Sequence, residues 1–340
     1  MKGIICSVFL TVAINGAICA QTSKPLSAPF GVNLAGADFG ANVPGVFNKD
    51  YTYPTGADLD YVKSKGLTLI RLPFLWERMQ PVLGESLDAK EVERFTEVID
   101  AAAERGILVL PDMHNYCRRK VEGEWLIIGS ERVPVEQVAN AWAKIADLLK
   151  DKKNIWGYGI MNEPHDMPAE NSWFTIAQAI ITSIRSKDSK TAIVVGGDSW
   201  SSAERWPYYS GNLKNLNDPA NNLIFEAHIY FDENSSGSYK YSYEKERATA
   251  ETGIVRAMPF VKWLKANNLK GFIGEYGVPD NDPRWLVTLD KMLDYLQKNG
   301  VNGTYWAAGP WWGDYHLAVQ PKNGIDRPQM KVVSRYPSAK

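Results

Sequence analysis

The sequence predicts a single (β/α)8 barrel domain, and three observations support this prediction. The chain has 340 residues, which suits one large α/β domain rather than a small cross-linked module. Short apolar runs alternate with longer amphipathic stretches, at intervals of roughly 40 residues. The apolar runs are continuous rather than alternating, which is typical of parallel strands that are buried on both faces.

Eight apolar segments are expected to form the strands of the barrel. In chain order they are residues 30–34, 68–72, 107–113, 156–161, 192–195, 223–229, 271–275 and 303–307.

The amphipathic stretches between these segments are expected to form helices. The clearest, residues 88–105, starts with Asp88 as a cap and stops before Gly106. The others are residues 56–65, 135–150, 169–187, 243–267 and 283–299, whereas the crossover 199–222 is expected to be irregular. An open doubly wound sheet is the alternative, but the sequence has no Gly-x-Gly-x-x-Gly at a strand-to-helix turn and no phosphate loop.

The N-terminal residues 1–20 are expected to be a secretory signal peptide. A short positive start precedes an apolar run, which ends in mostly small residues near Ala20. A buried terminal element and a lipid anchor on Cys19 are the alternatives. Residues 21–29 are expected to be a polar leader and residues 30–340 the domain, in a secreted or periplasmic protein. Cleavage would leave Cys117 as the only cysteine, so no intramolecular disulfide is expected.

The composition excludes several classes of partner. The formal net charge is −1, so no basic field attracts nucleic acid or an anionic membrane surface. No membrane association is expected after signal cleavage, and a monomer is the expected state for a protein with an open cleft. The 12 tryptophans suit sugar binding, because the apolar face of a pyranose packs on a flat aromatic surface.

Polar side chains gather at the ends of the predicted strands. Barrel enzymes carry their chemistry at the carboxyl ends of the strands, so these side chains are expected to meet around one opening. They are Arg71, Asp112, His114, Asn115, Asn162, Glu163, Glu226, His228, Tyr230, Glu275 and Trp306.

Two of these carboxylates, Glu163 and Glu275, follow the fourth and seventh predicted strands and should face each other across the opening. Cleavage of a glycosidic bond needs such a pair, one group as proton donor and one as nucleophile or base. The alternative is that each is an ordinary turn residue at a strand end. The sequence has no Gly-x-Ser-x-Gly nucleophile elbow, which argues against an esterase.

The remaining polar residues are expected to support this pair. Arg71 is expected to pair with Glu275 and keep it ionised, and Tyr230 to orient the same carboxylate. His114 and His228 could bind a metal together with the glutamates. The sequence has no His-Glu-x-x-His and no cysteine cluster, so no metal and no cofactor are expected.

Taken together, the strand ends resemble those of glycoside hydrolase family 5, the cellulase family of (β/α)8 barrels. The resemblance runs from Phe30 to about Pro328, with the matching pieces in the same order. They are Arg71-Leu72-Pro73-Phe74, His114-Asn115-Tyr116, Asn162-Glu163-Pro164, His228-Ile229-Tyr230, Gly274-Glu275-Tyr276-Gly277 and Tyr305-Trp306.

Three further segments are similar to sequences of the endo-β-1,4-glucanase branch that includes fungal endoglucanases. They are residues 31–40, 230–232 and 306–313. The resemblance implies that Glu163 is the acid/base and Glu275 the nucleophile of a retaining reaction on a β-1,4-linked polysaccharide. It implies a cis peptide bond after Trp306. It also implies a sugar site in which Asn162 binds a 2-hydroxyl, formed by Arg71, His114, Asn162, His228 and Tyr230, with Trp306 beneath the sugar.

Further contacts to the substrate are expected from Asn115 and from Trp200, Trp311 and Trp312 as stacking platforms; core packing is the alternative for each tryptophan. The sequence carries no cellulose-binding module, which favours a soluble or amorphous glucan. Mannan, xyloglucan, a mixed-linkage glucan or a bacterial exopolysaccharide would use the same catalytic residues. A non-catalytic carbohydrate-binding barrel would require the loss of a carboxylate, and both are present.

Overall fold

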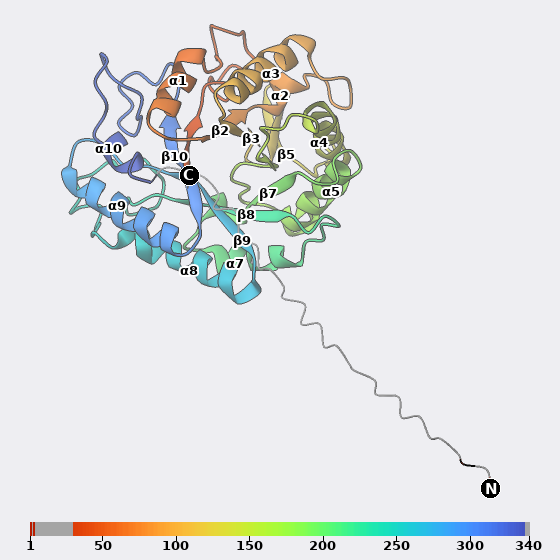
Figure 1. Cartoon of the computed structure of the whole chain (residues 1–340). Helices are drawn as coiled ribbons and strands as arrows, with labels where there is room; N and C mark the ends of the chain where they lie inside the picture. The colour runs from red at the N-terminus through yellow and green to blue at the C-terminus, as the bar shows by residue number, and fades with distance from the viewer. Residues whose placement is uncertain (2, 4–29, 337–340) are drawn as a thin grey trace.

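The computed structural model describes residues 30–336, together with Met1 and Gly3. The expected signal peptide and polar leader lie outside these residues, apart from Met1 and Gly3. Eight parallel strands close into a barrel in the order β1-β10-β9-β8-β7-β6-β3-β2, and helices surround it (Figure 1). This confirms the predicted (β/α)8 fold.

The barrel strands lie within two residues of the predicted segments at almost every end. Their bounds are β1 (Gly31–Leu34), β2 (Leu69–Phe74), β3 (Leu108–Met113), β6 (Gly157–Gly159), β7 (Ala192–Gly196), β8 (Leu223–Ile229), β9 (Lys270–Tyr276) and β10 (Asn302–Ala308).

Six longer helices follow the amphipathic stretches of the sequence. They are α1 (Gly56–Ser64), α3 (Ala89–Glu104), α4 (Val135–Leu149), α5 (Trp173–Arg185), α8 (Thr252–Asn267) and α9 (Pro283–Lys298). Side chains of Asp88, Ser172 and Asp282 accept hydrogen bonds from the first turns of α3, α5 and α9 and so fix their starts. Within residues 30–336, no helix is long and apolar enough to cross a membrane.

Short helical turns occupy the loops. They are α2 (Trp76–Met79), α6 (Asp198–Ser201), α7 (Trp206–Tyr209), α10 (Met330–Val333), η1 (Ala169–Asn171) and η2 (Gly211–Asn215). The crossover 199–222 contains only such turns, in agreement with its predicted irregularity.

Two predicted helices are shorter than the sequence indicated. Helix α5 starts at Trp173 rather than residue 169, because Ser172 caps it after a separate 3-10 turn. Helix α8 starts at Thr252 rather than residue 243. Glu246 instead accepts hydrogen bonds from two loop backbone amides, and Tyr243 bonds to a threonine of α9, so this segment is held as a loop.

A hairpin of β4 (Arg118–Val121) and β5 (Glu124–Ile127) was not predicted. It follows β3 and is connected by Glu122 and Gly123, whose φ angles are 51° and 89°. Positive φ at both positions is the geometry of a tight hairpin turn, and a Glu-Gly pair carries a weaker signal for that turn than Asn-Gly does.

The inward-facing side chains of the barrel change from apolar to polar toward its carboxyl end. A small apolar cluster contains Leu69, Leu110 and Ile224, which lie on β2, β3 and β8. Since alternate residues of a strand share a face, the next inward positions are Arg71, Asp112 and Glu226. The barrel therefore places a charged layer directly above an apolar plug.

Gly274 of β9 makes room for this charged layer. The pairing of β8 with β9 passes from Ala227–Ile273 to His228–Glu275 and skips Gly274, so the strand bulges there. A Cβ atom at this glycine would lie 1.8 Å from Glu226 Oε1. The bulge also changes the direction of Glu275, which follows immediately.

Gly274→Ala is expected to destabilise the protein by about 1–3 kcal/mol, because the added methyl group displaces a buried carboxylate. The free energy of unfolding in denaturant measures this effect. Gly211→Ala is the matched control, since its new Cβ would meet no atom closer than 3.9 Å. Equal stabilities for the two variants would contradict the packing argument.

Candidate active site

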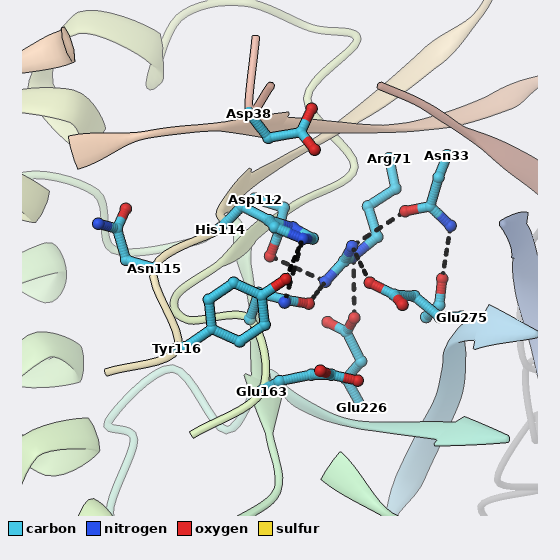
Figure 2. A network of polar contacts seen from close by, with 12 residues as sticks. Asn33, Asp38, Arg71, Asp112, His114, Asn115, Tyr116, Glu163, Glu226 and Glu275 are labelled. Carbon is cyan, nitrogen blue, oxygen red and sulfur yellow. Dashed lines mark hydrogen bonds and ion pairs between the residues drawn. The ribbon is translucent and has the colours of Figure 1, made fainter. Parts of the chain in front are cut away.

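Arg71 of β2 is fully buried at the centre of the opening (Figure 2). Its guanidinium nitrogens lie 3.0 Å from Asp112, 2.9 Å from Glu226 and 3.1 Å from Glu275. It also donates hydrogen bonds to the side-chain oxygens of Asn33 (2.9 Å) and Asn162 (2.7 Å). Arg71 thereby connects its own strand β2 to side chains on β1, β3, β8 and β9 and to Asn162, which follows β6.

The charges in this cluster influence one another. Burial opposes the charge of Arg71, but the carboxylates of Asp112, Glu226 and Glu275 outweigh it and raise the pKa of the guanidinium. Burial raises the pKa of Asp112, although Arg71 opposes the shift. Burial also acts to raise the pKa of Glu226, but the charges of Arg71 and His228 outweigh burial and lower that pKa. The arginine thus remains charged.

Both oxygens of Glu275 are held by donors. Oε1 accepts from Arg71 at 3.1 Å, and Oε2 accepts the hydroxyl of Tyr230 at 2.8 Å. The predicted contacts of these two residues with Glu275 are therefore present. This carboxylate is therefore oriented by two donors and lines the cleft.

Glu163 follows β6 and reaches the cleft from a backbone with φ of 43°, next to Pro164. Its Oε1 lies 2.7 Å from His228 Nδ1. An oxygen of Glu163 and an oxygen of Glu275 lie within 4.8 Å of each other. The two glutamates therefore face a common space, as the strand positions predicted.

His228 bridges three carboxylates. Nδ1 faces Glu163 and lies 3.6 Å from Glu275 Oε2, and Nε2 lies 3.1 Å from Glu226 Oε1. Burial disfavours the imidazolium, but the three carboxylates outweigh it and raise the pKa of His228 to about 10. The surrounding carboxylates therefore favour the imidazolium form of His228.

His114 occupies the equivalent position on the opposite wall. Nδ1 lies 2.9 Å from Asp112, and Nε2 lies 3.2 Å from both Asn162 Nδ2 and Tyr116 Oη. Because Arg71 orients the Asn162 amide, its NH2 group faces the imidazole and needs an acceptor there. A neutral ring protonated on Nδ1 meets this need, although Asp112 outweighs burial and raises the pKa of His114.

A cleft of about 440 Å³ opens above these groups. Trp306 lies in its wall and stacks on His114, with the ring centroids 5.4 Å apart. The peptide bond between Trp306 and Ala307 is cis, as the resemblance implied. The lining also contains Trp200, whose ring stacks on His165 at 4.4 Å.

The other two predicted platforms lie elsewhere. Trp312 packs between Tyr315 (4.7 Å) and Trp306 (5.8 Å) and donates its indole N–H to Ala308, so it braces the wall. Trp311 is half exposed and does not line this cleft. Neither ring is among the residues that line this cleft, and their roles as stacking platforms stay a prediction.

The side chain of Asn115 is buried in the protein and does not line the cleft. Its amide accepts the backbone N–H of Trp76 and donates to Glu77 at 2.8 Å each, and the side chain is buried. Figure 2 shows it pointing away from Arg71. His114 and Asn115 are consecutive, so alternation along the strand turns Asn115 away from the opening that His114 faces.

Several lining residues were not predicted as site residues. Tyr116 is the last residue of the segment His114-Asn115-Tyr116, and Tyr315 lies two residues after the segment 306–313. The remainder are Ser202, Arg205, Asn234, Ser235, Ser236 and Gly237. These lie in irregular loops, where side-chain direction depends on tertiary contacts that the sequence pattern does not report.

The clustering of Glu163, His228 and Glu275 also bears on metal binding. Each offers one donor atom within 4.8 Å of the others. Glu275 already accepts from Arg71 and Tyr230, however, and both nitrogens of His228 face carboxylates. The positive charge that two adjacent carboxylates need is thus supplied by Arg71 and the imidazolium.

The raised pKa of His228 predicts a loss of stability at alkaline pH. Its proton stabilises the native state fully below the unfolded pKa near 6.5, and this contribution disappears as pH rises through about 10. The difference in unfolding free energy between the wild type and His228→Gln should therefore shrink between these values. Denaturant titrations at several pH values measure it, and a difference that grows with pH would contradict the assignment.

Comparison with known proteins agrees with this geometry. Residues 30–311 match the model of Cellulase (glycosyl hydrolase family 5). A probable endo-β-1,4-glucanase B of Aspergillus kawachii is 35% identical over 301 residues, covering 87% of this chain and 86% of the relative.

Solved structures are similar over most of their length. Pseudomonas stutzeri endoglucanase Cel5A in complex with cellobiose has a TM-score of 0.84 and 42% identity, covering 90% of this chain and 91% of that one. XacCel5A in complex with cellopentaose has a TM-score of 0.83 and 39% identity, covering 90% and 98%. The chain therefore belongs to glycosyl hydrolase family 5, the cellulase family, and is a glycoside hydrolase.

Proposed function

We propose that this glycoside hydrolase is a retaining endo-β-1,4-glucanase, with Glu163 as acid/base and Glu275 as nucleophile. The observation that carries the proposal is the pair of carboxylates within 4.8 Å in one cleft, each held differently. Glu275 is bound by Arg71 and Tyr230, as an ionised nucleophile should be. Glu163 contacts His228 through one oxygen and is less buried.

In the first step, a Glu275 oxygen attacks the anomeric carbon of the bound sugar. The bond between that carbon and the glycosidic oxygen breaks, and Glu163 gives its proton to the departing oxygen. Arg71 and Tyr230 keep the attacking oxygens oriented, which limits the entropic cost of reaching the transition state. The products are a glycosyl ester on Glu275 and a shortened chain with a free hydroxyl group.

In the second step, water enters where the departing chain lay. Glu163, now ionised, removes a proton from this water while its oxygen attacks the same carbon. Glu275 leaves as a carboxylate, which Arg71 stabilises. Two inversions at one carbon give net retention of configuration.

The spacing favours retention over inversion. Retaining enzymes have carboxyl groups ~5–5.5 Å apart, whereas inverting enzymes need ~6.5–9.5 Å to seat a water between them. Oxygens within 4.8 Å leave little space for that water.

The substrate assignment rests on the cleft and on the named relatives. Trp306 and Trp200 offer apolar faces to sugar rings, and the histidines, Asn162 and the serines of 235–236 offer hydrogen-bond partners. Cellobiose and cellopentaose occur in the two solved structures described above, and both are β-1,4-linked glucose chains. Another β-glycan processed by the same groups is the alternative.

We also propose that the protein is secreted or periplasmic and acts as a monomer without nucleic acid, membrane or cofactor. The apolar N-terminal run supports export. The mechanism above uses only side chains of one chain.

Purified mature protein is expected to lower the viscosity of carboxymethylcellulose steeply while few new reducing ends form, because internal cuts shorten chains most. Glu275→Gln should lower this activity by at least about 10⁴-fold, since an amide is a very poor nucleophile. Viscometry with parallel counting of reducing ends measures both.

Two controls sharpen this experiment. The unfolding midpoint of Glu275→Gln shows whether the loss reflects chemistry rather than misfolding. Assays in excess chelator should give unchanged rates, because no step uses a metal. Wild-type inactivity on this substrate, with activity on mannan or xyloglucan, would move the substrate assignment to that β-glycan.

The stereochemical course gives an independent check. Proton NMR of a cello-oligosaccharide digest should show the β-anomer of the new reducing end first, followed by slow mutarotation to the α-anomer. Initial appearance of the α-anomer would contradict the retaining mechanism and the role of Glu275.

A further inference from the structure

Glu226 is a buried carboxylate that the proposed mechanism does not use. It lies on β8, two residues before His228, and is 2% exposed. Oε1 is 2.9 Å from Arg71 Nε and 3.1 Å from His228 Nε2. The glycine bulge at Gly274 clears the space that this carboxylate fills. The fold thus accommodates a charge that never faces the substrate.

The hydrogen-bond partners of His228 determine which of its nitrogens carry protons. A carboxylate oxygen can only accept, so Glu226 requires a proton on Nε2. In a neutral ring with that proton, Nδ1 would be a bare acceptor, and Glu163 would donate its own proton to it. With a second proton, Nδ1 instead donates to Glu163 Oε1.

The groups that face this ring favour the second arrangement. Glu163, Glu226 and Glu275 all lie within 3.6 Å of His228. Among the residues that the structure describes, Glu226 forms ion pairs with His228 and Arg71. Asp112 and His114 act on Glu226 from further away with opposite signs. When Glu163 carries its proton, the carboxylates of Glu226 and Glu275 still stabilise the doubly protonated ring.

We propose that Glu226 is a positioning residue for the acid/base Glu163. By holding His228 as a double donor, it makes the imidazolium occupy Glu163 Oε1, so that the proton used in catalysis is carried on Oε2. This inference rests on the proposed function and adds to it the residue that directs the proton.

The consequence for the first step is specific. The proton on Oε2 passes to the glycosidic oxygen as the bond to the anomeric carbon breaks, and the electron pair left on Glu163 is stabilised by Nδ1–H. Without Glu226, a neutral imidazole accepts the Glu163 proton through Nδ1, and that proton points away from the substrate. Protonation of the leaving group then suffers, whereas attack by Glu275 is less affected.

Leaving-group dependence tests this prediction. A 2,4-dinitrophenolate departs without protonation, whereas phenolate needs a proton. For Glu226→Gln, we expect kcat/KM on phenyl β-cellobioside to fall about 10- to 100-fold, part of the usual contribution of an acid. On 2,4-dinitrophenyl β-cellobioside the loss should be less than about threefold.

Asp112→Asn is the matched control. Asp112 is also buried and also contacts Arg71, but its histidine partner is His114, which does not touch Glu163. Its loss of kcat/KM should be the same on both substrates. Equal losses on both substrates for Glu226→Gln would overturn the proposal, and a wild type inactive on both would overturn the proposed function with it.

A measurement on the wild type remains decisive if Glu226→Gln does not fold. Nitrogen NMR of ¹⁵N-histidine-labelled protein distinguishes bare from protonated ring nitrogens among the four histidines, and His228→Gln identifies the signal. Protonation of both His228 nitrogens at pH 7 is expected. A bare Nδ1 would overturn the proposal.

Discussion

A single buried guanidinium organises the mouth of this barrel. Arg71 contacts Asp112, Glu226 and Glu275 within 3.1 Å, and each carboxylate belongs to a different strand. A buried charge needs such partners, and the removal of one member of a buried pair typically costs ~3–5 kcal/mol. The carboxylates in turn depend on the arginine, because without it they would repel one another. The arrangement of the three carboxylates at the mouth of the barrel therefore depends on this one buried cation.

The two histidines show how one local pattern can serve two purposes. Asp112–His114 at the end of β3 and Glu226–His228 on β8 both place a carboxylate two residues before an imidazole on the inward face. The difference lies in what the free nitrogen meets. His114 meets the amide of Asn162 and remains an acceptor, whereas His228 meets Glu163 and becomes a donor. In the proposed mechanism, the Glu226–His228 pair acts on the acid/base, whereas the Asp112–His114 pair presents an acceptor to Asn162.

The sequence predicted those features that depend on periodicity. Continuous apolar runs located all the barrel strands, and the polar residues at their ends located Arg71, Glu163 and Glu275, because parallel strands bring their carboxyl ends together. Asn115 could have been placed in the same way, because it follows the inward-facing His114 and side chains alternate along a strand. Features that depend on loop contacts were not predictable, such as the loop 234–238, whose amides at Gly237 and Ser238 donate to Asp232. Glu226 was visible, but its role depends on a bulge that only the strand register reveals.

The two walls of the cleft differ in how freely they can change. Trp312 packs against Phe39, Trp306 and Tyr315, so one wall is a continuous aromatic block that joins the loops after β1 and β10. The opposite wall is the loop after β8, shaped by Asp232, which accepts hydrogen bonds from the backbone amides of Gly237 and Ser238. The side chains of 234–236 line the cleft, and the Ser236 hydroxyl also donates to Asp232 at 2.8 Å. The two walls are therefore held in different ways, one by aromatic packing and the other by hydrogen bonds within a single loop.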